Sequence, residues 1–198
     1  VLRRQESGNL TPAAITEAST EIAREAERAG GIVQRIRHFA RKRLATREAV
    51  DLAGLAEEAR RLIVGMLARA PEVIIENRLQ GNCQVLADGA QIQQVLLNLI
   101  KNAMDANRDQ PIERQNLRIL IESLDNRIAV HVIDQGIGLE TEQLPHLFEP
   151  FFTTKPDGLG LGLPICKTII EAHGGRLWAE PNQDAPGMCF SFSLPCHE

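Results

Sequence analysis

Two asparagines lie four residues apart, at positions 98 and 102, in a segment whose apolar spacing predicts a helix over residues 90–106. Residues four apart project from neighbouring turns of one helix face. Asparagine is a poor helix former unless its amide has a partner, and its neutral carbonyl oxygen suits Mg²⁺ when phosphates complete the metal's shell. Asn102 is therefore a candidate magnesium ligand, and Asn98 a candidate to support it and orient phosphates. Lys101 projects about 100° away from Asn102, as a phosphate-neutralising or simply solvated lysine.

The stretch from Asp134 to Leu163 holds the second group of candidate residues. Glycines at alternate positions suit a backbone that turns sharply and approaches a ligand closely, and a helix that opens after such a loop offers N–H groups to an anion. Asp134 could accept the exocyclic amine of adenine, although aspartate before glycine is also a common turn residue. The stretch predicts a nucleotide site, with the base near Asp134 and phosphates near the last glycines. The five glycines are Gly136, Gly138, Gly158, Gly160 and Gly162.

The loop between these glycines is long, as active-site lids often are. It carries Lys155, a cation that could reach a terminal phosphate from a mobile loop. It also carries Phe148, Phe151 and Phe152. Since three exposed phenylalanines in one loop would be unusual, we expect all three to anchor the lid by packing on the core.

The segments that must position these residues predict an α+β fold. Strands are expected at residues 73–76, 83–87, 117–124, 127–133, 176–179 and 188–194, and helices at 51–66, 90–106 and 164–172. This order favours a two-layer α/β sandwich, with a largely antiparallel sheet and helices on one face. Residues 44–49 lose the helical pattern and are expected to form a linker.

The N-terminal segment predicts a separate long helix. Apolar residues recur every seven positions at Ile15, Ile22, Ala29 and Ile36, which indicates the seam of a coiled coil or helical bundle. The chain is therefore expected to divide into a partial helical hairpin over residues 1–45 and a second domain over residues 50–198.

Composition excludes several classes of protein. The chain has 198 residues, 43% of them hydrophobic, and a net charge of −4, so it shows no global basic footprint for nucleic acid. No apolar run is long enough to cross a membrane. The four cysteines form no CxxC pair, and we expect them to be reduced packing residues in a cytosolic setting. The sequence does not begin with methionine, so we expect it to be part of a longer protein.

Four motifs in order resemble the catalytic, ATP-binding part of a sensor histidine kinase, within the gyrase, chaperone, kinase and mismatch-repair ATPase superfamily. The resemblance that these motifs carry covers about residues 50–195. They are NLIKNAMDA (residues 98–106) for the N box, DQGIG (134–138) for the G1 box, LFEPFFTTK (147–155) for the F box and GLGLGL (158–163) for the G2 box.

The resemblance implies the Bergerat ATP-binding fold, with ATP and Mg²⁺ as cofactors. It gives Asn102 the metal role with Asn98 in support, Asp134 the adenine role, and Lys155 a catalytic role in the lid. It also implies a homodimer through the N-terminal helix and a response-regulator receiver domain as partner. The implied location is cytoplasmic, either for the whole protein or for the cytoplasmic portion of a membrane-anchored sensor. The remaining implied nucleotide contacts are Lys101, Gly136, Gly138, Phe151, Thr154, Gly158, Gly160, Leu161 and Gly162.

One departure concerns the phosphoacceptor, which in this family is a histidine followed by an acidic residue and then Pro-Leu. No histidine here matches, and His38 is followed by Phe-Ala-Arg. We therefore expect the acceptor to lie upstream and this sequence not to phosphorylate itself. Two alternatives stay open, an ATPase of the same superfamily that uses nucleotide for conformational gating and a nucleotide-binding scaffold without kinase activity. The first would need a carboxylate in the N-box region to activate water, where Gln93, Gln94 and the two asparagines stand instead.

Overall fold

The computed structural model describes residues 15–23, 46–66, 71–79, 83–111, 115–155 and 158–197. The chain divides into two compact units, residues 1–43 and residues 44–198. In the first unit residues 15–23 are helical, and Ile15 and Ile22, seven positions apart, are both exposed. The rest of the predicted seam helix, including His38, lies outside the described residues.

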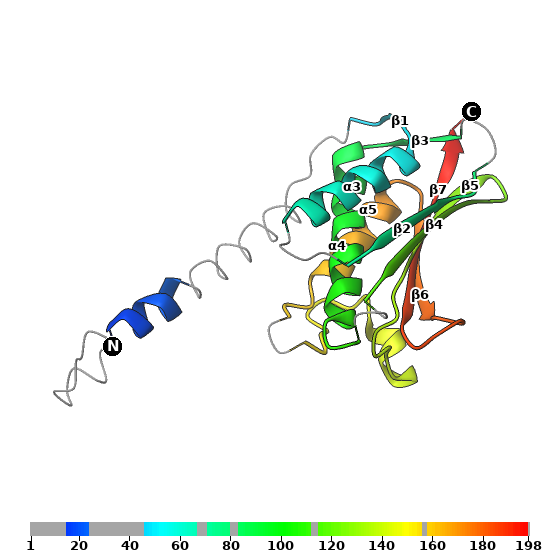
Figure 1. The fold of residues 1–198 in the computed structure, drawn as a ribbon. Coiled ribbons are helices and arrows are strands. Elements are labelled where there is room, and N and C mark those ends of the chain that lie inside the picture. Colours follow the sequence, from blue (N-terminus) through cyan, green and yellow to red (C-terminus); the bar gives the residue numbers. More distant parts are fainter. Residues whose placement is uncertain are drawn as a thin grey trace. The chain divides into compact units, whose positions relative to one another are not determined.

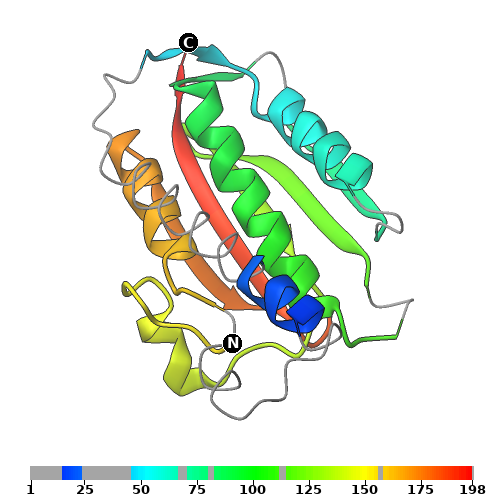
Figure 2. The same ribbon diagram turned by 90° about the vertical axis from the view of Figure 1, so that its left-hand side faces the viewer.

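Residues 44–198 form two layers, a mixed sheet and three helices that cover one of its faces (Figure 1, Figure 2). Figure 2 shows α4, in green, running along the middle of the helical layer between α3 and α5. In chain order the elements are β1 (Glu48–Val50), α3 (Leu52–Met66), β2 (Val73–Asn77), β3 (Gln84–Ala87), α4 (Gly89–Asn107), β4 (Leu117–Leu124), β5 (Arg127–Ile133), the 3₁₀ helix η2 (Thr141–His146), α5 (Gly162–Ala172), β6 (Arg176–Pro181) and β7 (Met188–His197).

The sheet has seven strands in the order β1-β3-β7-β5-β4-β2, with β6 also paired to β7. The long strand β7 organises it, because β5 pairs along one edge while β6 and β3 share the other. Every pairing is antiparallel except that of β2 with β4. The prediction of a largely antiparallel sheet with helices on one face is therefore confirmed.

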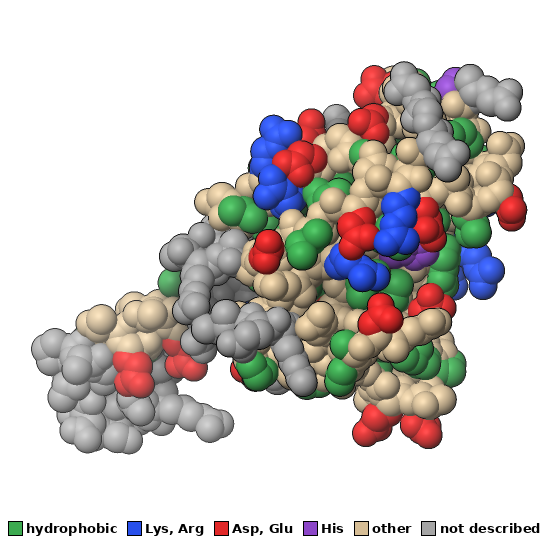
Figure 3. Space-filling model, turned by 45° about the vertical axis from the view of Figure 1, so that its right-hand side comes forward, with side chains coloured by type: hydrophobic (Ala, Val, Ile, Leu, Met, Phe, Trp, Pro, Cys, Tyr) green, Lys and Arg blue, Asp and Glu red, His purple; other side chains and the backbone are tan. Residues whose placement is uncertain are grey.

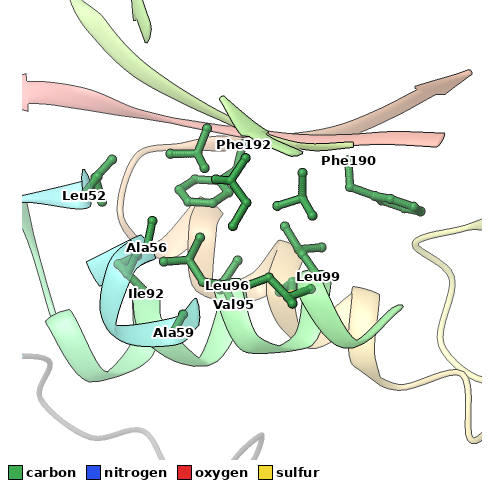
Figure 4. Close-up of a cluster of buried hydrophobic side chains, with 14 of the residues drawn as sticks. Leu52, Ala56, Ala59, Ile92, Val95, Leu96, Leu99, Phe190 and Phe192 are labelled. Carbon is green, nitrogen blue, oxygen red and sulfur yellow. The ribbon is translucent and has the colours of Figure 1, made fainter. Parts of the chain in front are cut away.

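The core lies between α4 and the sheet. Ile92, Val95, Leu96 and Leu99 follow the helical period and are fully buried, on the side of α4 toward which Phe192 of β7 projects (Figure 4). Apolar residues three and four apart form one face of a helix. That buried face fixes the rotation of α4 about its axis, and so fixes which residues remain on its other sides.

The opposite face of the sheet is polar. Arg118 of β4 alternates with buried Ile119 and lies near Glu76, with Nε 3.5 Å from a carboxylate oxygen. His131 of β5 faces Glu122 at 3.5 Å, and burial lowers the pKa of this imidazole below its ordinary value. Figure 3 shows basic, acidic and histidine side chains gathered on one face of the molecule. This alternation is typical of an antiparallel sheet with one solvated face.

Two expectations about the first strands are wrong. The predicted linker over residues 44–49 contains the start of β1, whose three residues pair antiparallel with β3. Cys83 and Cys196 form a disulfide, with Cα atoms 6.4 Å apart, so they are not reduced thiols. The pair forms because β3 runs antiparallel to the end of β7, which brings together residues 113 apart in sequence. Cys166 and Cys189 are free and buried, as predicted.

Candidate nucleotide-binding site

Helix α4 is the element against which both glycine-rich loops pack. Asp88 caps its first turn, since the carboxylate accepts a hydrogen bond from the backbone N–H of Gln91. A Cβ on Gly136 would lie 2.6 Å from the carbonyl oxygen of Ala106. A Cβ on Gly162 would lie 2.8 Å from Oδ1 of Asn98. Eight residues of helix span about 12 Å, so the two loops meet α4 at separate points, with Asn102 between them in sequence.

Asp134 directly follows β5, and two backbone N–H groups hold its carboxylate in place. One oxygen, Oδ1, accepts hydrogen bonds from the backbone N–H groups of Gly136 at 2.9 Å and Met188 at 3.1 Å. Among the described residues no hydrogen bond reaches the other oxygen, Oδ2. Burial raises the pKa of Asp134, against the lowering effect of those two N–H groups and of Lys155. A buried carboxylate with one free oxygen is an acceptor for a ligand's N–H donor.

Asp134 is supported by three residues that the sequence analysis did not predict. Asn182 donates from Nδ2 to the Asp134 carbonyl oxygen at 2.8 Å. Gly187 leaves room for the aspartate, because a Cβ there would collide with its backbone carbonyl. Asn107, buried at the end of α4, accepts from the backbone N–H of Gln135 at 3.2 Å. Asn107 carried a weak signal, since it continues the helix that bears the two predicted asparagines.

Asn98 and Asn102 are both partly buried on α4, and their surroundings differ. Asn98 donates from Nδ2 to the sulfur of Cys166 in α5 at 3.1 Å. The carboxamide of Asn102 has no hydrogen-bond partner among the described residues. An unpartnered amide one turn after Asn98 on the same face of α4 fits a metal ligand whose other ligands arrive with the nucleotide. The same end of the site includes the first turn of α5, where N–H groups lack partners within the helix.

The loop between the two glycine groups begins with η2 and folds partly onto the core. Phe148 and Phe152 pack against the hydrophobic cluster, as predicted. Phe151 does not, because the residue is 75% exposed. Its backbone has a φ of 70° and donates to the carbonyl of Gly160 at 2.9 Å, which fixes the backbone while the ring points outward. The prediction that all three phenylalanines anchor the lid is therefore wrong for Phe151.

Lys155 reaches from the lid to α4. Its Nζ lies 2.9 Å from a carboxylate oxygen of Asp105, which also pairs with Arg108 at 3.0 Å. Asp105 was not predicted, although its position was visible in the sequence: it lies three residues after Asn102 and seven after Asn98, on the same helix face. The lid lysine is thus held over the helix that carries both asparagines.

The other predicted contacts surround these groups. Lys101 is exposed on α4, and Thr154 is exposed in the lid. Gly158 follows the lid lysine and is partly exposed. Leu161 is the N-cap of α5, and Gly138 adopts a φ of 71° shortly after Asp134. Close approaches to α4 are thus established for Gly136, Gly162 and Lys155, whereas Lys101 and Thr154 are exposed to solvent.

A family model described as histidine kinase-, DNA gyrase B-, and HSP90-like ATPase matches residues 87–198. The sensor protein FixL of Bradyrhizobium diazoefficiens is 41% identical over 184 residues, which cover 91% of this chain and 35% of FixL. The chain thus spans about a third of the length of that relative. The match to the family model begins at the end of β3 and includes both glycine loops, the lid and α4.

Solved structures of the histidine kinase ThkA have a similar fold. Its nucleotide-free catalytic domain gives a TM-score of 0.64 at 32% identity, over 75% of this chain and 95% of that one. ThkA in complex with the response regulator protein TrrA gives a TM-score of 0.74 at 28% identity, over 98% of this chain and 55% of that one. The predicted α+β sandwich and the resemblance to sensor histidine kinases are confirmed by these matches.

Proposed function

This chain belongs to the family of histidine kinase-, DNA gyrase B- and HSP90-like ATPases, and we propose that it is the ATP-binding kinase core of a sensor histidine kinase. In this role it binds ATP and positions the γ-phosphoryl group for transfer to a histidine, and the phosphoryl group then passes to an aspartate of a response regulator. Such catalysis rests mainly on positioning and charge neutralisation. The packing of both glycine loops on α4, at Asn98 and Ala106, is the observation that carries the proposal.

The adenine end of the proposed site is Asp134. Its free oxygen Oδ2 accepts a hydrogen bond from the exocyclic amine of adenine, while Oδ1 stays hydrogen-bonded to two backbone N–H groups. Guanine carries a carbonyl at the equivalent position, which would face the aspartate without a hydrogen bond. The contact therefore selects ATP over GTP, since an unpaired buried polar group costs about 1–3 kcal/mol.

The phosphate end is formed by α4, the lid and the first turn of α5. Asn102 would hold Mg²⁺ with Asn98 in support, and the ion would neutralise charge on the phosphates. The unpartnered Asn102 carboxamide supports this assignment. Lys155 leaves Asp105 to contact the terminal phosphate when nucleotide is present. Backbone N–H groups near Gly162 add to this, because the N-terminal end of a helix favours an anion.

The partners follow from the same role. ThkA binds a response regulator, and we propose that this chain acts on a receiver domain of that kind. We also propose a homodimer through the N-terminal helix, which the exposed heptad positions Ile15 and Ile22 support. None of the helices in the described ranges is both long and apolar enough to cross a membrane. A response-regulator partner and the use of ATP favour a cytoplasmic location for this chain, whether or not the whole sensor is membrane-anchored.

Calorimetric titration with a non-hydrolysable ATP analogue, with Mg²⁺ and with a chelator, tests the first half of the proposal. We expect binding that Mg²⁺ strengthens, and absence of binding by folded protein would refute the function. The second half needs γ-labelled ATP and the phosphoacceptor hairpin of the full-length sensor. Label on the hairpin histidine is expected. Hydrolysis without transfer would favour a gating ATPase, and binding without either reaction would favour a scaffold.

A further inference from the structure

Cys166 lies in the second turn of α5 and contacts Asn98 of the neighbouring helix α4, the residue predicted to support the metal. Its sulfur accepts the hydrogen bond from Nδ2 of Asn98 at 3.1 Å. This is the only hydrogen bond that the Asn98 side chain makes to any described residue. Cys166 itself is 1% exposed, inside the hydrophobic core. A core residue of α5 thus holds a polar side chain of α4.

The thiol accepts this bond through its sulfur, and its S–H, itself a weak donor, then points away from Nδ2. Burial raises the pKa of Cys166 to about 12, so the group is a neutral thiol at physiological pH. A neutral, buried thiol is neither a nucleophile nor a metal ligand, both of which require the thiolate. It behaves as a small apolar side chain whose sulfur is a weak acceptor and whose S–H is a weak donor.

A second neighbour confines the same carboxamide. A Cβ on Gly162 would lie 2.8 Å from Oδ1 and 2.9 Å from Nδ2 of Asn98, so the amide lies against the first residue of α5. With Nδ2 bound to Cys166, Oδ1 is the atom left without a partner in the described structure. The oxygen and nitrogen of a carboxamide are nearly equal in size, and only hydrogen bonding decides which one points where.

We propose that Cys166 orients the carboxamide of Asn98, so that Oδ1 and not Nδ2 faces the magnesium and phosphate end of the site. The inference rests on the proposed function, because it assigns a cause to the support that Asn98 gives there. If the amide turned over, it would present an NH₂ group toward a cation. Cys166 is in this sense a positioning residue, which acts through Asn98 and contacts neither nucleotide nor metal.

Three substitutions separate this role from simple packing. Cys166→Val keeps a compact apolar side chain but removes the acceptor, and Cys166→Ala removes it without adding volume. Cys166→Ser keeps an acceptor oxygen. Nucleotide affinity measured in a chelator and in Mg²⁺ then splits the effect. A packing defect would weaken both, whereas loss of orientation acts on the magnesium-dependent part.

Calorimetry with the ATP analogue should show that Cys166→Val weakens magnesium-dependent binding about three- to tenfold, the range expected for one neutral hydrogen bond. Binding in the chelator should not change, and Cys166→Ser should behave like wild type. In an Asn98→Ala background, Cys166→Val should add nothing. Equal losses with and without Mg²⁺, or equal losses for Val and Ser, would overturn the inference. Cys166→Ala is measured in the same way if the valine variant does not fold.

A measurement without nucleotide keeps this inference separate from the proposed function. Hydrogen exchange of the Asn98 side-chain NH₂, followed by NMR, should be slow in wild type and Cys166→Ser and fast in Cys166→Val. Fast exchange in wild type would show that the orienting bond is not made, whatever the protein binds. If exchange is slow but wild type does not bind Mg²⁺–nucleotide, the function fails and the orienting role fails with it. If wild type binds and Cys166→Val binds equally well, only the inference fails.

Discussion

Replacing Asp134 by asparagine should have opposite effects on nucleotide binding and on stability. The amide keeps Oδ1 as acceptor for Gly136 and Met188, so the loop should hold its shape. At the other position Nδ2 replaces the free oxygen, and a donor then faces the exocyclic amine of adenine. A hydrogen bond to a charged group is worth about 1.5–3 kcal/mol. Because about 1.4 kcal/mol corresponds to a factor of ten, affinity for the ATP analogue should fall by roughly 10- to 150-fold.

The stability effect follows from the raised pKa of Asp134. The folded protein binds this proton more tightly than the unfolded chain does. The stabilisation from protonation is fully present below the unfolded pKa, near about 3.9, and is lost as pH rises through the raised pKa of the folded state. At neutral pH the wild type therefore carries a buried carboxylate that Asp134→Asn does not. The variant should be more stable than wild type near pH 7, and the difference should shrink as pH falls.

Two assays measure the two effects on the same samples. Calorimetry with ATP and GTP analogues gives affinity and base preference, and urea unfolding from pH 4 to pH 8 gives stability without ligand. Asp134→Ala is the comparison, because it removes the acceptor for both N–H groups and should destabilise. Unchanged ATP affinity in Asp134→Asn would refute the adenine role. A variant less stable than wild type by a pH-independent amount would refute the reasoning about burial.

Three further predictions concern the loops and the disulfide. Gly160→Ala should lower the free energy of unfolding by at least about 1–2 kcal/mol in a urea titration, because an L residue at a φ of 62° is strained. The matched control is Gly65→Ala, which should be neutral or stabilising because an added Cβ there meets no atom within 4 Å. Reducing the bond between Cys83 and Cys196 with a dithiol should lower that free energy by about 2–4 kcal/mol, and an equal urea midpoint with and without reductant would contradict the disulfide. Asp105→Asn should free the lid lysine and raise affinity for a triphosphate by at most about fivefold, the limit for a partly exposed ion pair, with no change for adenosine monophosphate; weaker triphosphate binding would show that the carboxylate assists the lysine.

The parts of the fold that sequence predicts well are those set by local pattern. The apolar period of α4 and its capping Asp88 defined that helix to within a residue or two. The hairpin of β4 and β5 was placed without error, since alternation and a two-residue turn are both local signals. The N box lies on α4 and the G1 box directly follows β5, so these two motifs were placed together with the elements that carry them.

The parts that sequence missed depend on contacts between distant segments. Strand β1 has three residues and is defined by its pairing with β3, which no local pattern reveals. The same holds for the bond between Cys83 and Cys196, since cysteine spacing along the chain says nothing about strands that meet at a sheet edge. Asn182 supports Asp134 from 48 residues away. Such residues become visible only when the topology of the sheet is known.

The two ends of the site differ in what excludes a side chain from its glycines. At Gly136 the obstacle is the backbone carbonyl of Ala106, and at Gly187 it is the backbone of Asp134; neither can move without moving a helix or a strand. At Gly162 the obstacle is the carboxamide of Asn98, which can rotate unless something holds it. The end of the proposed site at Asp134 is therefore rigid by construction. The proposed phosphate end depends on side-chain contacts, and for that reason the weak hydrogen bond from Asn98 to a buried thiol matters there.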